Sequence, residues 1–220
     1  MADTCSQMRD SCVPSREEML AALEKRQGED AVRKLQAATV AVCGLGGLGS
    51  NIAISLARAG VGKLILVDFD RVDVTNLHRQ QYKACQVGMP KPEALLANLK
   101  EIAPYTDFET HSEKVTAENA VPLLANADVI CEAFDNAEAK AMLVNTVLET
   151  MPEKFLVAAS GMAGYDSGNS IATRKVTKRF YVCGDGQSDV GDGIGLIAPR
   201  VMLCAAHQAL VAIRLILGLE

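Results

Sequence analysis

The sequence lacks a run of basic residues, a C-x-x-C pair and an internal repeat. Its formal net charge is −5, which argues against a sequence-independent nucleic-acid surface and against an anionic membrane as a partner. The seven cysteines are scattered along the chain, a pattern typical of reduced cytoplasmic thiols rather than of a disulfide framework. We therefore expect a cytoplasmic protein that binds neither nucleic acid nor membrane.

We also expect no targeting or membrane-spanning segment in this sequence. The first fifteen residues, MADTCSQMRDSCVPS, contain no apolar stretch like that of a signal peptide. The most apolar stretch, 196–219, is interrupted by charged residues and a proline, which indicates a buried or half-buried helix. With 220 residues, of which 49% are hydrophobic, the chain is long enough for one domain with a substantial core.

The chain is organised around a stretch that begins TVAVCGLGGLGSN. The apolar run Val40–Cys43 leads into glycines spaced G-x-G-x-x-G, and 50–58 has helical composition up to a stop at Gly60. This pattern predicts a strand, a tight turn and a helix N-terminus whose free N–H groups hold a phosphate. The glycines of this turn are Gly44, Gly46, Gly47 and Gly49.

A second strand, Lys63–Val67, ends in Asp68, which is placed to accept hydrogen bonds from a ribose hydroxyl. Polar residues then follow in DFDRVDVTNLHRQ, and VGMPKPEA adds a lysine. Fixed cations beside phosphates suit a site where negative charge builds up during phosphoryl or nucleotidyl transfer. A nicotinamide-dependent dehydrogenase has no use for them beside its ring. The candidate binding residues in these two stretches are Asp70, Asn76, Arg79, Gln80 and Lys91, of which Arg79 and Lys91 are the cations.

Lys91 lies between two prolines, and Pro92 predicts a helix from there to Ile102, with Lys91 at or beside its N-cap. An ammonium at a helix N-terminus is unfavourable on its own because the macrodipole is already positive there. A bound anion would remove this conflict. The alternative is a solvent-exposed lysine on a turn. Asp70 is a candidate contact at the edge of the nucleotide, and its alternative role is a helix or turn cap.

Further along, strands and helices alternate. We expect strands at 107–115, 128–132 and 155–159, separated by helices that end near Ala125 and Glu149. Phe134, Asp135 and Asn136 follow the strand 128–132. Since ligands gather beyond the carboxyl ends of parallel strands, the glycine turn, Asp68 and Asp135 should meet in one crevice.

These elements predict an α/β fold, a Rossmann-like nucleotide-binding sheet with helices on both faces. Short strands with glycine turns after residue 160 predict an antiparallel extension, which makes the sheet mixed. We divide the single domain into a flexible segment 1–15, N-terminal helices 16–38, a nucleotide-binding core 39–160 and a C-terminal part 161–220. That last part contains a glycine stretch, 184–195, expected to be mobile, and a final helix, 199–217. The N-terminal helices pack against a partner subunit or cover the chain's own sheet.

Taken together, GLGGLGS, DFDRVDVTNLHRQ, the lysine of VGMPKPEA and the strand-end FDN resemble the ThiF/MoeB branch of the ubiquitin-activating-enzyme superfamily. The resemblance covers roughly residues 26–220. The short length and the ending FYVCGDG…APRVMLCAAHQ are most similar to compact ThiF proteins of thiamine biosynthesis. Such enzymes use ATP and Mg²⁺ to adenylate the C-terminal glycine of a small ubiquitin-like sulfur carrier that ends in Gly-Gly.

The resemblance assigns roles to the candidate residues. It implies that Arg79 and Lys91 bind phosphates, that Asn76 lies beside them and that Asp68 binds the ribose. It also implies that Asp135 holds magnesium, a hard cation suited to carboxylate and phosphate oxygens. In the family an N-terminal helix of the other subunit supplies an arginine. Arg26 is our choice, with Arg16 second, and either implies a homodimer.

The sequence departs from larger relatives, which carry two C-x-x-C pairs for a structural zinc. Cys204 and His207 share a helix face and Cys183 is a third candidate ligand, but three candidates make a poor tetrahedral set, so no zinc site is expected. In some relatives a cysteine near Cys183 joins the carrier covalently, so Cys183 is either a nucleophile or an inert thiol that ends a strand. Cys43 and Cys131 are expected in the core, His78 as a loop-orienting residue and His111 on a surface strand.

The leading hypothesis is therefore ATP-dependent adenylation of a thiamine-type sulfur carrier, with a sulfur donor acting later. The same nucleotide site would serve a molybdopterin-type carrier, a peptide, or a tRNA-modifying dehydratase, although the last should have a more basic surface. Alternatives from other classes are a nicotinamide-dependent oxidoreductase and a nucleotide-sensing or carrier-docking module without turnover.

Overall fold

The computed structural model describes residues 13–192 and 195–220. Most of the segment 1–15 that we predict to be flexible lies outside these residues, as do two residues of the glycine stretch 184–195. Within the described part, seven strands form one sheet in the order β3-β2-β1-β4-β5-β7-β6. Their bounds are Thr39–Cys43 (β1), Lys63–Val67 (β2), Asp107–His111 (β3), Val129–Glu132 (β4), Phe155–Ala159 (β5), Ala172–Lys175 (β6) and Phe180–Gly184 (β7).

The sheet is mixed, which confirms the predicted α/β class. All neighbouring pairs are parallel except β6 and β7. The C-terminal extension differs from a purely antiparallel one because the chain leaves β5, reaches the outer edge at β6 and turns back. The returning strand β7 then lies between β6 and β5, so it runs in the direction of β5.

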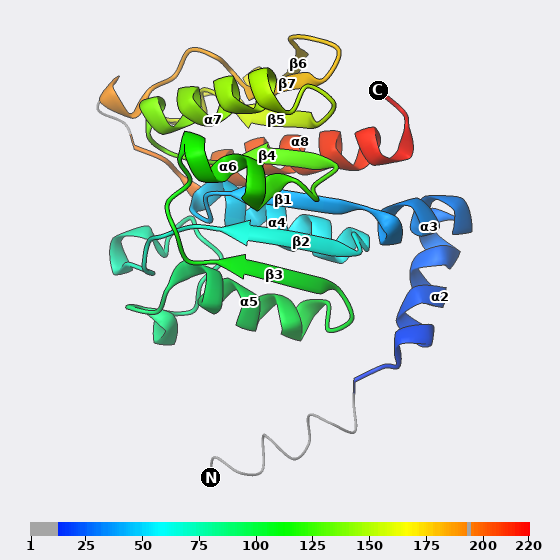
Figure 1. Cartoon of the computed structure of the whole chain (residues 1–220). Helices are drawn as coiled ribbons and strands as arrows, with labels where there is room; N and C mark the ends of the chain where they lie inside the picture. Colours follow the sequence, from blue (N-terminus) through cyan, green and yellow to red (C-terminus); the bar gives the residue numbers. More distant parts are fainter. Residues whose placement is uncertain (1–12, 193–194) are drawn as a thin grey trace.

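Helices cover both faces of the sheet (Figure 1). On one face α4 packs over β1 and β2, α5 over β3, and α8 over β4, β5 and β7, all in the larger core cluster. On the other face α6 and α7 pack in a second cluster around Ile65, Ile130 and Leu156. The helices are Arg16–Gln27 (α2), Glu29–Ala37 (α3), Gly47–Ala59 (α4), Lys91–Ile102 (α5), Ala117–Leu124 (α6), Ala137–Thr150 (α7) and Ala198–Leu217 (α8). Single turns of 3-10 helix lie at Val74–Asn76, Ala84–Gln86, Gly168–Ser170 and Val190–Asp192.

Local sequence signals account for several helix boundaries. Thr116 caps α6 through a capping box with Asn119, and Asn136 caps α7. Gly60 ends α4 in the left-handed conformation, with φ at 92°. The predicted strand 107–115 is shorter in the structure and ends at His111. The polar residues after His111 leave the edge of the sheet, and Val115 is buried beyond the end of the strand.

The apolar helix α8 is long and apolar enough to span a membrane by length and composition alone, but half of its most apolar window is buried inside the protein. It packs along α4 and crosses β4, β5 and β7. Cys204, Ala205 and Ala212 on its inner face are fully buried. This agrees with the predicted buried or half-buried helix.

Candidate active site

One cavity of about 860 Å³ opens at the carboxyl edge of the sheet. It is lined from the ends of β1, β2, β4 and β5, the edge at which parallel strands place their ligands. The structure therefore brings together in one place nearly all of the residues that the sequence indicated. The predicted residues on its wall are Gly44, Gly46, Gly47, Asp68, Asp70, Asn76, Arg79, Gln80, Lys91 and Asp135.

The glycine turn is shaped by backbone contacts that leave no room for side chains. Gly44 has φ at 90°, and a Cβ there would lie 2.7 Å from the carbonyl oxygen of Ala133. A Cβ on Gly49 would lie 1.7 Å from the carbonyl oxygen of Gly44. Gly46 caps α4 without any side-chain hydrogen bond, so the first N–H groups of this helix are available to an anion.

Asp68 lies at the end of β2 and is 7% exposed. Its carboxylate accepts hydrogen bonds from the backbone N–H groups of Leu45, at 2.6 Å, and Asp70, at 2.8 Å. Burial raises the pKa of this carboxyl, while Lys91 and the two N–H donors lower it in part. Asp68 therefore anchors the glycine turn, and the ribose contact that the sequence suggested stays a prediction.

Lys91, at the start of α5, is 5% exposed and does not lie free on a turn. Its ammonium lies 2.8 Å from a carboxylate oxygen of Asp70 and 3.8 Å from one of Asp68. Asp70 is thus the ion-pair partner of Lys91 rather than a helix or turn cap. These two carboxylates offset the unfavourable field of the helix N-terminus, the conflict for which the sequence suggested a bound anion.

Arg79 is the second of the expected phosphate-binding cations on the cavity wall. Its Nε and the Oε1 of Gln80 are buried and have no hydrogen-bond partner among the described residues. Burial lowers the pKa of the Arg79 guanidinium, and the Asp135 carboxylate opposes this shift, which places Asp135 within electrostatic reach. An unsatisfied buried donor costs free energy, so the site is prepared for an anion that the protein does not itself supply.

The residues present fit a magnesium ion that arrives with a nucleotide. Mg²⁺ is commonly held by one or two carboxylates together with substrate phosphates, and Asp135 offers an exposed carboxylate on the cavity wall. Within the described part of the chain, no group of three or more His, Cys, Asp or Glu side chains is arranged to hold a metal. Cys183, Cys204 and His207 therefore do not form the metal set considered from the sequence.

The surroundings of Cys183 do not fit the nucleophile role considered from the sequence. We considered it as a nucleophile at the mouth of the glycine stretch, but the side chain is fully buried and lies outside the cavity wall. Burial raises the pKa of the Cys183 thiol to about 11, although a hydrogen bond with Thr173 lowers it in part. In this structure the residue matches the inert-thiol alternative, because a protonated, enclosed sulfur is a poor nucleophile.

The arginines expected from the N-terminal helices lie away from the cavity. Arg26 is exposed in the last turn of α2, and Arg16 lines a smaller cavity of about 310 Å³ between α2, α4 and α5. Figure 1 shows α2 beside the edge of the sheet where the strands begin. Neither arginine reaches the cavity of its own chain, so a role in catalysis stays a prediction that involves a second copy.

His78 bridges two loops at the cavity, as a loop-orienting residue would. Its ring nitrogens lie 2.9 Å from the carbonyl oxygen of Thr75 and 3.2 Å from that of Leu196. His111 is half-buried on the edge strand β3 and contacts Glu109. Cys43 and Cys131 are fully buried in the core, as predicted.

Besides the pair of Lys91 and Asp70, two ion pairs were not anticipated from the sequence, one on the cavity wall and one beyond it. In the first, Glu132 at the end of β4 is buried, and its carboxylate oxygens lie 2.9 and 3.0 Å from the ammonium of Lys140 on the cavity wall. Lys140 also donates to the carbonyl of Ala159. The available signal was an acidic residue inside an otherwise apolar strand, which is rarely buried unless it is paired. The second pair, Arg200 with Asp185, is described below.

Replacing Lys140 by methionine is expected to lower the free energy of unfolding by about 3 kcal/mol at pH 8, because it leaves the Glu132 charge buried and unpaired. Burial already raises the pKa of Glu132 above 4.5, and Lys140 lowers it in part. Without Lys140 the folded-state pKa rises further. A carboxyl with a raised folded pKa destabilises the fold as pH increases above its unfolded value, so the loss should be smaller at pH 5.

Urea unfolding at pH 5 and pH 8 measures this difference. Lys83→Met is a matched control, because Lys83 forms an exposed pair with Glu101 and its loss should cost less than about 1 kcal/mol. Equal destabilisation of Lys140→Met at both pH values would show that the Glu132 charge is not the cause.

The fold and the cavity together define a class. A mostly parallel sheet carries a glycine turn at its carboxyl edge, and the crevice there is lined by several basic side chains, Arg79 and Lys91 among them, and by the exposed carboxylate of Asp135. This is a Rossmann-like α/β protein whose site is suited to a polyanionic ligand.

A model of the ThiF family matches residues 19–220. The chain belongs to this family, within the ThiF/MoeB branch of the ubiquitin-activating-enzyme superfamily, as its motifs indicated.

Similar proteins include "Adenylyltransferase and sulfurtransferase MOCS3" of Aedes aegypti, 31% identical over 202 residues, which cover 84% of this chain and 43% of that protein. "Adenylyltransferase and sulfurtransferase UBA4" of Lodderomyces elongisporus is 31% identical over 196 residues, covering 86% and 42%. The chain thus spans less than half the length of these curated relatives. Neither is named as a thiamine-type protein, so that narrower part of the resemblance stays a prediction.

Among solved structures, Escherichia coli tRNA N6-threonylcarbamoyladenosine dehydratase, TcdA, in complex with ATP has a TM-score of 0.84 at 21% identity, covering 94% of this chain and 97% of the other. E. coli MccB has a TM-score of 0.66 at 22% identity, covering 87% and 60%. These similarities confirm the fold.

Proposed function

We propose that the protein is an ATP-dependent adenylyltransferase that acts on the C-terminal glycine of a small ubiquitin-like sulfur carrier. The observation that carries this proposal is the Nε of Arg79, which has no partner among the described residues, in a cavity shared with Lys91, Asp135 and the start of α4. The names of the MOCS3 and UBA4 relatives and the ATP complex of TcdA support it. A nicotinamide-dependent oxidoreductase would leave both cations without a task.

In this reaction an oxygen of the carrier carboxylate attacks the α-phosphorus of ATP. The bond from that phosphorus to the bridging oxygen breaks, which yields an acyl-adenylate and pyrophosphate. Both reactants are anionic, so the protein contributes mainly by positioning them and by neutralising charge. Arg79 and Lys91 do this from the cavity wall. Asp135 would hold the magnesium ion, which supplies further neutralisation on the phosphates.

The carrier itself is part of the proposal. The ending of the sequence suggests the thiamine-type carrier, whereas the MOCS3 and UBA4 relatives suggest another sulfur carrier. The same site would serve either, followed by a sulfur donor. We also propose a homodimer, because Arg26 lies outside the cavity of its own chain and would complete the site only from a second copy.

A second candidate is adenylation of a carboxylate carried by tRNA. The near-complete mutual coverage with TcdA favours it, at 94% of this chain and 97% of that one. The net charge of −5 does not, because tRNA binding usually relies on a basic surface.

The test is isotope exchange between labelled pyrophosphate and ATP in the presence of Mg²⁺. We expect exchange when a ubiquitin-like protein ending in Gly-Gly is added, and none when that protein lacks its last glycine. Exchange with neither carrier type, but with tRNA, would favour the second candidate. Nucleotide binding without any exchange would instead support a sensing or docking module.

A further inference from the structure

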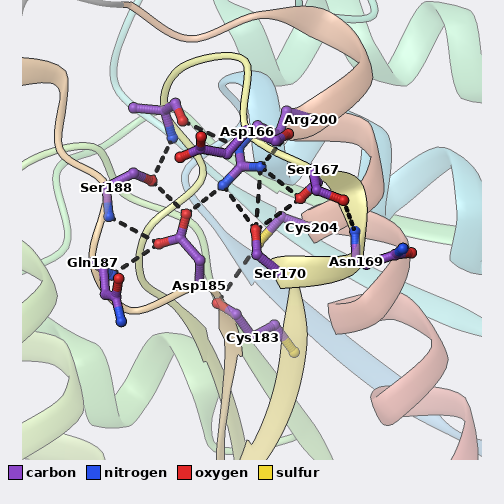
Figure 2. Close-up of polar contacts among 11 residues, drawn as sticks. Asp166, Ser167, Asn169, Ser170, Cys183, Asp185, Gln187, Ser188, Arg200 and Cys204 are labelled. Atoms are coloured by element: carbon purple, nitrogen blue, oxygen red, sulfur yellow. Dashed lines mark hydrogen bonds and ion pairs between the residues drawn. The ribbon is translucent and has the colours of Figure 1, made fainter.

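Arg200, in the first turn of α8, is a buried cation outside the site described so far. It is 3% exposed, and its guanidinium is surrounded by acceptors from two loops. Its Nε donates to the carbonyl of Ala163 at 3.1 Å, and its Nη1 to the carbonyls of Asp166 and Ser167 at 2.7 and 3.0 Å. The guanidinium also contacts the hydroxyl of Ser170 and forms an ion pair with Asp185 (Figure 2).

Asp185 forms the other half of this network. It accepts hydrogen bonds from the backbone N–H groups of Gln187 and Ser188, at 2.8 and 2.9 Å, and from the Ser188 hydroxyl at 2.7 Å. Burial raises the pKa of Asp185, but these donors and Arg200 outweigh it and lower the pKa to about 2. The Ser188 hydroxyl in turn accepts from the N–H of Ala163 at 3.0 Å, which closes a ring between the loops.

The two loops follow different strands. The first, 160–170, follows β5, and the second, 184–190, begins at the last residue of β7. Backbone hydrogen bonds of 2.9 Å join Asp185 to Gly161 and Gly186 to Ser160. A Cβ on Gly161 would lie 2.0 Å from a carboxylate oxygen of Asp185, so the loops pack with no space between them. The first half of the predicted mobile stretch is therefore anchored.

Both loops line the active-site cavity. Their residues on its wall are Ser160, Gly161, Met162, Ala163, Ser188, Asp189 and Val190. In the part of the chain that the structure describes, no hydrogen bond of Arg200 or Asp185 reaches the glycine turn, Asp68 or Lys91. The network thus shapes a wall of the cavity apart from the residues expected to bind phosphates.

A buried ion pair is weak evidence for a stabilising role, because apolar packing often does equally well. A planar guanidinium with five directed donors does, however, fix several backbone segments in one geometry. Misplacing a substrate-binding wall by about 1 Å lowers rates by up to about 100-fold. The location of this network therefore points to positioning.

We propose that Arg200 and Asp185 are positioning residues that hold loops 160–170 and 184–190 as the wall against which the carboxylate substrate binds, separately from ATP. This inference rests on the proposed function. It predicts that disturbing the network raises the KM for the carrier and leaves the affinity for ATP unchanged.

The variants are Arg200→Met, Arg200→Lys and Ser188→Ala, measured for carrier KM in pyrophosphate exchange and for ATP affinity by equilibrium binding. Arg200→Met should raise the carrier KM about 10-fold or more. Its affinity for ATP should stay within about twofold of the wild-type value. Arg200→Lys keeps the charge but cannot reach all the carbonyls, so its effect should be intermediate. Ser188→Ala removes one link between the loops and should act in the same direction.

Arg214→Met is the matched control on the same helix, because Arg214 forms an exposed ion pair with Glu220 and should leave both quantities unchanged. If Arg200→Met does not fold, the carrier KM and ATP affinity of Arg200→Lys and Ser188→Ala test the inference instead. An unchanged carrier KM in these variants, or an equal loss of ATP affinity, overturns the inference. Absence of exchange in the wild type with every carrier overturns the proposed function, and this inference with it.

Discussion

Replacing Arg79 by alanine is expected to lower pyrophosphate exchange by about 100- to 1,000-fold, the usual cost of removing a donor that stabilises charge in the transition state. The fold should remain intact. The Nε of Arg79 has no partner among the described residues, so its removal breaks no hydrogen bond of that atom and relieves an unsatisfied buried donor. The measurement is the exchange rate together with thermal unfolding.

Arg58→Ala is the matched control, because Arg58 is exposed on α4 and lines the small cavity near α2 instead. It should leave exchange unchanged. Near-full exchange in Arg79→Ala would contradict the assignment of this residue. Loss of exchange together with a large drop in melting temperature would show that Arg79 acts through the fold, against our expectation.

Replacing Gly49 by alanine is expected to abolish nucleotide binding and to destabilise the protein by about 3 kcal/mol or more, the upper range for overpacking. The added Cβ would lie 1.7 Å from the carbonyl oxygen of Gly44 and 3.1 Å from a methyl of Val42. The first neighbour is backbone and cannot rotate away, so α4 must move off β1. That displacement would open the turn whose N–H groups face the cavity.

Gly195→Ala serves as the control, because a Cβ there has nothing within 4 Å among the residues that the structure describes. Equilibrium nucleotide binding and urea unfolding of the two variants make the comparison. A Gly49→Ala protein that binds ATP as tightly as the wild type would show that close approach of α4 to β1 does not shape the phosphate site.

Much of the site follows from local sequence patterns. The spacing of Gly44, Gly46 and Gly49 determines a strand, a turn and a helix start because only glycine permits such close backbone approach. Pro92 predicts the start of α5 and so the place of Lys91. Asp68 and Asp135 each follow a buried strand, and the rule that ligands lie at the carboxyl edge of parallel strands brings them into one cavity.

Other features depended on contacts between distant parts of the chain. Arg200 pairs with Asp185 and with the carbonyl of Ala163, which are 15 and 37 residues away, and no local pattern signals such loop contacts. The burial of Cys183 likewise depends on how β7 inserts between β5 and β6. A strand pattern states which residues alternate, but it does not state which neighbours cover them.

The sequence by itself therefore determined the family, the fold class and the half of the cavity formed by the glycine turn and the ends of β2 and β4, because glycine spacing and strand ends are recognised within a few residues. Only the tertiary structure decided the parallel direction of β7, the partners of Lys91, and the buried pairs Glu132–Lys140 and Arg200–Asp185. Each of these arises where segments far apart in sequence meet, and there the free energy of burying a charge depends on what the rest of the fold places beside it.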